Sequence, residues 1–220
     1  MKRIEIVFED KKMMVLDKAS GVVTTKEGRD VDTVEDWLLD NFDWAAGLVR
    51  GGTVHRLDKG TSGLLVVAKT IDSLDHLKMQ FKKRLVYKEY WALIEGDVSF
   101  KGEIYAPIGR SKYNFLKWKV TEEGKDAWTV FDLVKKYEVG GKMYSLVKIV
   151  LKTGRTHQIR VHFSYLGWPL VGDKLYGGKT NMVSRPFLHA KKIGFIGVDG
   201  VNFEIESDLS DDLGSVLEVE

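Results

Sequence analysis

Cysteine is absent from this chain of 220 residues, which excludes disulfides, thiol nucleophiles and metal sites built on thiolates. Proline is rare, at three residues, and no repeat or low-complexity stretch divides the chain, so there is little room for an extended linker. The longest apolar run, residues 63–68, is far shorter than the roughly 18 residues that a membrane span needs. Together these absences predict one domain over residues 1–220 in a cytoplasmic setting.

Positive charge is concentrated in the middle of the chain, although the net formal charge is only +2. Residues 51–203 carry 26 Lys and Arg against 14 Asp and Glu, whereas residues 204–220 carry none against 7. A basic region of this kind fits a surface that binds a polyanion, because each cation that neutralises a phosphate releases a condensed counterion. On charge alone, a solvated surface that folding mixes with the acidic ends remains open as an alternative.

The pattern of apolar residues predicts an α+β fold, in which a mixed, largely antiparallel β-sheet carries a few flanking helices. Strands are expected at residues 4–8, 13–16, 64–68, 86–94, 127–134 and 144–152, with Gly140-Gly141 as the turn between the last two. Helices are expected at residues 32–42 and 70–84, and in a short segment that Gly167 ends. Their expected caps are Asp32 with Glu35, then Thr70, and then Thr156.

Three common catalytic or cofactor motifs are incomplete in this sequence. The segment 172–174, Gly-Asp-Lys, lacks the Gly-Lys-Ser/Thr of a phosphate-binding P-loop. Ser62 lacks the second glycine of a nucleophile elbow, because Leu64 occupies that place. No two histidines are four residues apart, and His157 and His162 are separated by five, which places them on different faces of a helix. We therefore expect no metal and no nucleotide cofactor.

The segment 54–69 places a carboxylate, Asp58, between two cations and ahead of a turn rich in Gly, Ser and Thr that leads into a buried strand. An aspartate in such a place can cap the turn by accepting hydrogen bonds from backbone N–H groups. It can also be a functional anion whose pKa is held low by the neighbouring Arg56 and Lys59. The residues of this segment alone leave both roles open.

A second long segment, residues 151–163 followed by 167–177, completes a pair of motifs. With both in view, the chain closely resembles the RluA-type family of RNA pseudouridine synthases. The resemblance extends over nearly the whole chain, with shorter matches at residues 18–21, 87–92, 107–110, 124–129 and 187–190. It departs from the family at Ala19, where proline is usual, and at Ile196-Gly197, where His-Pro is common. Because the match begins within the first ten residues, we expect no S4-like RNA-binding domain ahead of it.

The resemblance implies a pseudouridine synthase fold with a central RNA-binding cleft. It also implies an isomerase that converts uridine to pseudouridine in structured RNA, with ribosomal RNA as the first candidate and transfer RNA as the second. It implies no cofactor, no membrane and no obligatory protein partner, and we expect a monomer. A non-catalytic RNA-binding or assembly protein on the same fold is the main alternative. A glycosidic-bond hydrolase would need a second carboxylate to activate water, and none is evident near the motifs.

The resemblance also assigns the catalytic set. Asp58 is implied to be the catalytic aspartate, and Arg160 to pair with it and keep it ionised. Tyr90 is implied to face the active site and to stack on the target base. The reaction breaks the N-glycosidic bond, rotates the uracil and rejoins the ribose to ring carbon 5. The carboxylate could attack covalently or stabilise a cation-like sugar and move a proton, and the sequence leaves both routes open.

A further set of residues is expected to bind the substrate around that centre. Arg56 could fill the gap left by an extruded base or contact a phosphate. His55, Thr61 and Ser62 are expected to shape the loop by hydrogen bonding. The rest of the expected substrate-binding set is Lys88, Arg155, His157 and Gln158. The candidates for the flanking RNA surface are Lys82, Lys83, Arg84, Lys112, Lys117 and Lys119, with Tyr113, Phe115 and Trp118 interleaved, although an interrupted β-hairpin would show the same alternation.

Overall fold

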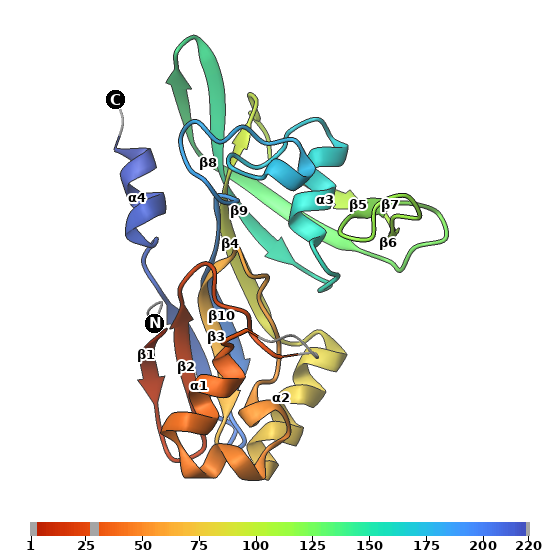
Figure 1. Cartoon of the computed structure of the whole chain (residues 1–220). Coiled ribbons are helices and arrows are strands. Elements are labelled where there is room, and N and C mark those ends of the chain that lie inside the picture. Colours follow the sequence, from red (N-terminus) through yellow and green to blue (C-terminus); the bar gives the residue numbers. More distant parts are fainter. Residues whose placement is uncertain (1–3, 27–30, 219–220) are drawn as a thin grey trace. The chain divides into compact units, whose positions relative to one another are not determined.

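The computed structural model describes residues 4–26 and 31–218, and it divides the chain into two compact units. Unit 1 comprises Met1–Tyr87 with Ala190–Ser210, and unit 2 comprises Lys88–His189 with Asp211–Glu220 (Figure 1). Both units combine antiparallel strands with short helices, so the predicted α+β class is confirmed. Within the described ranges, no helix is both long and apolar enough to cross a membrane.

The strands of unit 1 form a sheet in the order β1, β2, β3, β10, β11. Their bounds are β1 (Ile4–Glu9), β2 (Met13–Lys18), β3 (Ser62–Ala68), β10 (Leu188–Ile196, in this unit from Ala190 onward) and β11 (Asn202–Glu206). The pairs β1–β2, β2–β3 and β10–β11 are antiparallel. Every residue of β3 is buried, which agrees with the continuous apolar run that the sequence shows at this strand.

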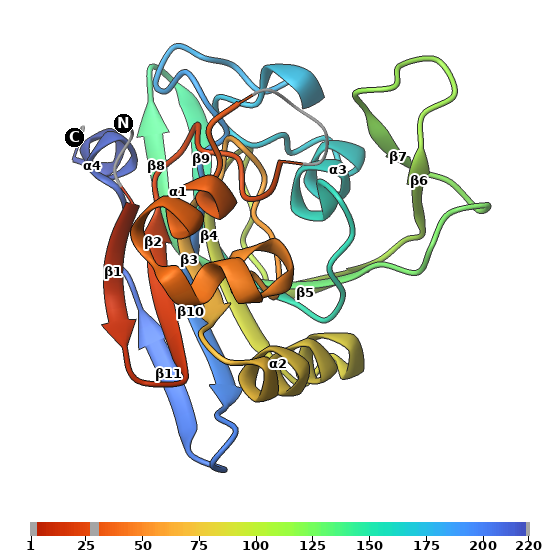
Figure 2. The same ribbon diagram turned by 60° about the horizontal axis from the view of Figure 1, so that its bottom comes forward.

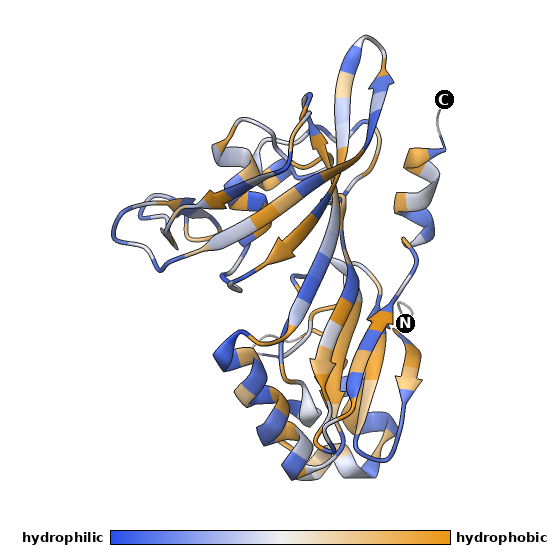
Figure 3. Ribbon diagram, turned by 180° about the vertical axis from the view of Figure 1, so that it is seen from behind, coloured by the Kyte–Doolittle hydropathy of each residue, from blue (hydrophilic) through white to orange (hydrophobic). Residues whose placement is uncertain are grey.

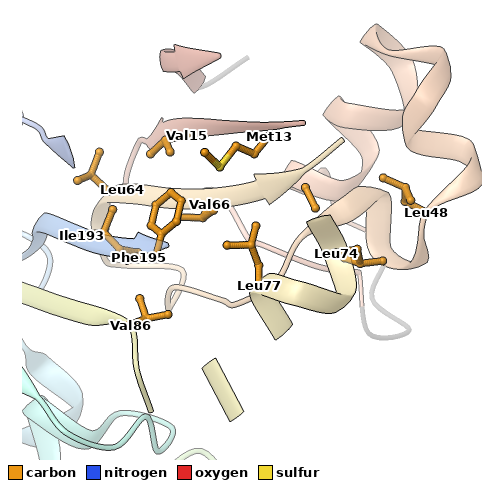
Figure 4. Close-up of a cluster of buried hydrophobic side chains, with 11 residues drawn as sticks. Met13, Val15, Leu48, Leu64, Val66, Leu74, Leu77, Val86, Ile193 and Phe195 are labelled. Carbon is orange, nitrogen blue, oxygen red and sulfur yellow. The ribbon is translucent and has the colours of Figure 1, made fainter. Parts of the chain in front are cut away.

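The core of unit 1 lies between this sheet and helix α2 (Ile71–Lys83), as Figure 4 shows. Leu74 and Leu77 of the helix belong to the same buried cluster as Val15, Val66 and Ile193 of the strands. Figure 3 shows hydrophilic and hydrophobic residues alternating along α2, as expected for a helix with one buried face.

The helix caps of unit 1 are local hydrogen bonds. Thr70 caps α2 as predicted, because its side chain accepts a hydrogen bond from the Ser73 N–H at 3.2 Å. Helix α1 (Val34–Asn41) was expected to have its capping box at Asp32 and Glu35, and that prediction is wrong by one residue. The box is formed by Thr33 and Asp36, since each side chain accepts a hydrogen bond from the other residue's backbone N–H. Two 3₁₀ helices, Asp43–Gly47 and Val49–Gly52, follow α1.

The strands of unit 2 form an antiparallel sheet in the order β4, β9, β8, β5. Their bounds are β4 (Tyr87–Glu95), β5 (Gly102–Tyr105), β8 (Trp128–Val139) and β9 (Lys142–Leu151). The predicted turn between β8 and β9 is confirmed, because Gly140 and Gly141 have φ of 58° and 70°, a region that favours glycine. A separate hairpin is formed by β6 (Ile108–Arg110) and β7 (Trp118–Val120), beside α3 (Gln158–Tyr165) (Figure 2).

The helices of unit 2 differ from the sequence expectation in two respects. Thr156 does not cap α3, since the N-cap residue is His157, which adopts a left-handed conformation with φ of 56° and gives no side-chain cap. A 3₁₀ helix at Lys174–Tyr176 and helix α4 (Asp211–Leu217) were not predicted. Helix α4 is joined to the rest of unit 2 by a two-point ion pair between Arg185 and Asp212, with distances of 2.6 and 2.7 Å.

Candidate active site

The loop that carries Asp58 is fixed by hydrogen bonds on both sides of that residue. The preceding Leu57 is buried, and its N–H donates to the Thr24 hydroxyl oxygen at 3.1 Å while that hydroxyl donates back to the Leu57 carbonyl at 2.9 Å. After Asp58, the Thr61 N–H donates to the Asp58 carbonyl at 3.0 Å, which closes a turn. Asp58 is half-buried between the exposed residues Arg56 and Lys59. The carboxylate is therefore carried by a backbone segment with little freedom.

A buried lysine supports this loop from the turn at residues 18–22. The Lys18 ammonium is fully buried and donates to the carbonyls of Ala19 and Val22 at 3.1 and 2.9 Å. The turn then contacts the Asp58 loop, because the Gly21 N–H donates to the Lys59 carbonyl at 2.6 Å. Hydrogen bonds from Lys18 thus fix the turn that contains Ala19.

His55 has structural contacts within unit 1. Its Nε2 accepts a hydrogen bond from the Val66 N–H at 2.9 Å, and its ring stacks on Phe81 at 4.6 Å between centroids. A ring nitrogen that accepts carries no proton, so the proton of the neutral imidazole lies on Nδ1. Thr61 is also buried, and the Ser62 hydroxyl lies 3.3 Å from that of Ser210. These contacts support the expected role of the three residues in shaping the loop.

Arg160 and Asp173 form a buried, two-point ion pair within unit 2. Arg160 Nε donates to one carboxylate oxygen at 2.6 Å, and Nη2 donates to the other at 2.8 Å. Asp173 is only 1% exposed and Arg160 only 8%. Paired, charge-assisted hydrogen bonds of this kind fix both the position and the plane of the guanidinium. Asp173 lies inside the second motif, yet its role was not predicted, because the sequence shows no contact between residues that are 13 positions apart.

Tyr176 extends the support of Arg160 to a neighbouring strand. Its ring centroid lies 4.9 Å from the guanidinium carbon Cζ, a cation–π contact. The Tyr176 hydroxyl accepts a hydrogen bond from the Trp118 N–H at 2.9 Å and lies 2.9 Å from Nδ1 of His157. One tyrosine therefore connects Arg160, the β6–β7 hairpin and the N-terminus of α3.

Gln158 has all four hydrogen-bonding positions of its amide occupied within the protein. The amide oxygen accepts from the Thr153 hydroxyl and from the Arg155 N–H, at 2.8 and 2.9 Å. The amide nitrogen donates to the Trp128 carbonyl and to the Thr129 hydroxyl, each at 3.0 Å. Because the side chain is also buried, these contacts favour a structural role over the direct contact with substrate that was expected.

His162 continues this network on the next turn of α3. Its Nε2 lies 3.0 Å from the Ala106 carbonyl, which can only accept, so Nε2 carries the proton. Its Nδ1 then accepts from the Thr129 hydroxyl at 2.9 Å. Burial lowers the pKa of His162, with an opposing contribution from the hydrogen bond to Ala106. His162 is thus a neutral residue of the core.

The remaining predicted residues divide between the two units. Asp58 belongs to unit 1, whereas Tyr90 and Arg160 belong to unit 2. Tyr90 is 8% exposed on β4, and the half-buried Lys88 precedes it by two positions, on the same side of the strand. Arg155 is half-buried, and its Nε donates to the Asp126 carbonyl at 2.8 Å.

Part of the segment expected to form the flanking RNA surface is a β-hairpin, which was the other explanation of its alternating residues. Residues 111–117 connect β6 to β7, and Tyr113 and Phe115 in this connection are 94% and 74% exposed. Trp118 instead packs partly buried against Val161 and Tyr176. Lys82, Lys83 and Arg84 are exposed at the end of α2 in unit 1.

Comparison with known proteins identifies the family. Residues 12–165 match the model of the RNA pseudouridylate synthase family. The chain belongs to this family. The predicted resemblance to the RluA type is confirmed, since the chain is 37% identical over 95% of its length to ribosomal large subunit pseudouridine synthase D of Pseudomonas aeruginosa, and the match spans 69% of that protein. It is also 37% identical over 98% of its length to the uncharacterized RNA pseudouridine synthase YlyB of Bacillus subtilis, of which the match spans 72%.

A solved structure agrees with this assignment. The human RNA pseudouridylate synthase domain containing 1 superimposes with a TM-score of 0.80 at 27% identity, covering 98% of this chain and 88% of that one. The chain is therefore an isomerase of the pseudouridine synthase family that converts uridine in RNA to pseudouridine.

Proposed function

We propose that the chain modifies uridine in ribosomal RNA of the large subunit, with Asp58, Tyr90 and Arg160 as its active site. The observation that best supports this active site is the buried Arg160, whose guanidinium is fixed by Asp173 and Tyr176. The substrate follows from relatives such as the Pseudomonas aeruginosa protein, which is named for the large ribosomal subunit. Transfer RNA is the second candidate.

In this proposal Asp58 acts as an anion and the Arg160 guanidinium is its counter-charge. Asp173 engages Nε and Nη2 of Arg160 and so fixes the plane of the guanidinium within unit 2. Because Asp173 and Tyr176 hold the plane of Arg160, that partner is preorganised before RNA binds.

The isomerisation then proceeds in a balanced sequence. The bond between uracil N1 and ribose C1′ breaks, the uracil rotates, and its C5 bonds to C1′. C5 loses its proton and N1 gains one, so the atoms of substrate and product are equal in number. Asp58 supports the step as a nucleophile or as the counter-charge to a cation-like sugar. Tyr90 stacks on the uracil and limits its rotation.

Other parts of the chain complete the proposal. Arg56, Lys88, Arg155 and His157 contact the RNA around the target uridine, while His55, Thr61 and Gln158 hold the loops that carry the site. The two units act as one catalytic domain, as a cytoplasmic monomer, without a cofactor. A protein that only binds RNA is disfavoured, because the family activity needs the carboxylate and guanidinium that this chain retains.

Pseudouridine mapping tests the proposal. Ribosomal and transfer RNA would be compared from cells with and without the gene, and purified enzyme would be added back to each RNA. We expect one or more pseudouridines in large-subunit RNA to vanish with the gene and to return with the wild-type enzyme but not with Asp58→Asn. Loss confined to transfer RNA would contradict the proposed substrate, and restoration by Asp58→Asn would contradict the proposed site.

A further inference from the structure

A cavity of about 350 Å³ lies within unit 2 beside the β6–β7 hairpin, and none of the three proposed catalytic residues lines it. Its lining residues include Arg110, Trp118 and Lys125, and residues 154–156 ahead of α3. Its size is within the range of about 300–1,000 Å³ that small-molecule sites in proteins occupy. Among its lining residues, the proposed function above gives a role only to Arg155, as a contact to RNA.

The charge on the cavity favours an anion. Arg110, Lys125 and Arg155 line it, and the carboxylate among its lining residues, Glu123, is paired with Lys112 at 3.4 Å. Three cations therefore face a carboxylate that already has its own counter-charge. A phosphate is the anion that such a group of Lys and Arg side chains binds best.

The arginines of the cavity are held by backbone carbonyls before any ligand binds. Arg110 donates from Nε and Nη2 to the Phe115 carbonyl at 3.3 and 3.2 Å. Arg155 donates from Nε to the Asp126 carbonyl at 2.8 Å. Carbonyl partners fix the positions of the two guanidinium groups without neutralising their charge. The Lys125 ammonium has no hydrogen-bond or ion-pair partner among the described residues, so it can move to meet a ligand.

An aromatic wall and a bare backbone floor complete the cavity. Trp118 contributes the aromatic residue, and its backbone N–H donates a hydrogen bond to the Tyr176 hydroxyl. Gly109 and Gly124 form the floor, where backbone approaches backbone. A Cβ added to Gly124 would lie 2.5 Å from the Ile108 carbonyl carbon, so only glycine permits this approach. A flat π-face beside a phosphate site is the combination that binds one nucleotide of a single strand.

We propose that this cavity binds one nucleotide of the RNA substrate next to the target uridine, with its phosphate among Arg110, Lys125 and Arg155 and its base on Trp118. The inference rests on the proposed function and adds a second binding point on the same RNA. Two connections tie the cavity to the catalytic residues of unit 2. The loop at residues 154–156 leads directly into α3, which carries Arg160, and Tyr176 contacts both Trp118 and Arg160.

A nested series of RNA oligonucleotides tests this inference. The series starts from an RNA fragment that the wild-type enzyme modifies and lengthens it by one nucleotide at a time on each side of the target uridine. Dissociation constants are measured in an Asp58→Asn background, so that the RNA stays unchanged. We expect affinity to improve by about tenfold at the single addition that fills the cavity, because stacking and one phosphate contact are gained together.

Two variants of the cavity and one matched control identify the origin of that step. Arg110→Gln/Lys125→Gln is expected to remove most of the step and to reduce the log–log salt slope by about 0.7, the value for one phosphate of a single strand. Trp118→Leu is expected to remove the part of the affinity step that depends on the base. In this variant, an abasic nucleotide at that position should therefore cause no further loss of affinity. The control Lys101→Gln/Lys135→Gln removes the same charge from exposed residues of unit 2 outside the cavity, and it should keep the step.

Several outcomes would overturn the inference. A step that persists in Arg110→Gln/Lys125→Gln, or that the control removes equally, would assign the affinity to other residues or to net charge. If free AMP or UMP bound to the cavity as tightly as the added nucleotide of the oligonucleotide does, the cavity would be a site for small molecules instead of RNA. Because Trp118 is partly buried, the exposed double variant keeps the test valid if Trp118→Leu fails to fold. If wild type modifies no ribosomal RNA fragment, the proposed function fails, and this is visible before any variant is made.

Discussion

Arg160 and Asp173 bind each other through two hydrogen bonds of 2.6 and 2.8 Å, and neither side chain is more than 10% exposed. Removing one partner of a buried ion pair leaves the other charge uncompensated, which strongly destabilises the folded protein. Asp173 should therefore affect stability and the position of Arg160 strongly, although it is proposed to contact no substrate. Asp173 is in this sense a positioning residue for Arg160.

Replacing Asp173 with asparagine should therefore impair both stability and catalysis. The change removes the counter-charge, and we expect a loss of about 3–5 kcal/mol in unfolding free energy. Loss of the guanidinium's orientation should lower kcat on the order of 10²-fold, with a smaller change in KM. Denaturant unfolding and turnover assays measure the two effects.

Asp212→Asn is the matched control for that experiment. Asp212 forms the same two-point pair, with Arg185, but its side chain is 52% exposed. Water reaches the Asp212 carboxylate, and Arg185, although only 10% exposed, keeps hydrogen bonds to the Pro186 and Leu188 carbonyls, so we expect a smaller destabilisation than for Asp173→Asn and an unchanged kcat. Equal effects of the two variants would mean that Asp173 has no special role in positioning Arg160.

Asp58→Asn should abolish pseudouridine formation while folding and RNA binding persist. The substitution is nearly isosteric and removes only the charge, and we expect kcat to fall by at least about 10³-fold. Asp75→Asn, an exposed aspartate of α2 in the same unit, should retain full activity. Turnover in Asp58→Asn close to that of wild type, with contamination excluded, would contradict the assignment of Asp58 as the catalytic aspartate.

Arg56→Ala should distinguish extrusion of the target base from simple attraction to phosphate. Arg56 is exposed two residues before Asp58. If it fills the gap left by the extruded base, its loss should slow the modification of a folded stem-loop at least about tenfold more than that of a short single strand, because unstacking costs a few kcal/mol in a stem. Rates at saturating RNA make this comparison, and equal losses on both substrates would indicate a phosphate contact.

His162 should make the protein less stable in weak acid. Burial lowers its pKa in the folded state below the ordinary value of 6.5. The unfolded chain therefore binds more protons below that pH, and stability should decline as the pH falls from about 6.5 toward the folded-state pKa. The slope due to one histidine is at most about 1.4 kcal/mol per pH unit. Urea unfolding of wild type and His162→Gln across pH 5–8 measures it, and identical slopes would show that His162 does not contribute.

Local signals explain which elements could be predicted from the sequence. The start of α2 at Thr70 is a contact between residues three apart, and the Gly140-Gly141 turn needs only its own φ angles. Helix α4 offered no such signal, since its four polar or small residues leave a weak pattern and its contact with Arg185 spans 27 residues. The short strands β5, β6 and β7 were missed because three or four residues are too few for apolar alternation to be recognised.

The candidate site follows the same rule. Asp58, Tyr90 and Arg160 could be proposed because each lies in a motif that can be read along the chain. The support of Arg160 by Asp173 and Tyr176 depends on a 3₁₀ turn that brings them back to α3, and no local pattern encodes that return. Gln158 was assigned to the substrate because its motif was visible, whereas the four partners of its amide were not.

The four hydrogen bonds of the Gln158 amide also indicate which parts of the enzyme can change conformation when RNA binds. Its bonds tie the segment 153–155 to β8, so that segment cannot rearrange without breaking several hydrogen bonds at once. In the hairpin connection at residues 111–117, the Ser111 and Asn114 side chains accept hydrogen bonds from backbone N–H groups of the same connection, whereas the Tyr113 and Phe115 side chains are 94% and 74% exposed. In the proposed complex with RNA, we therefore expect the segment 153–155 to act as a fixed template, and adaptation by unit 2 to come from the exposed aromatic side chains of the hairpin connection.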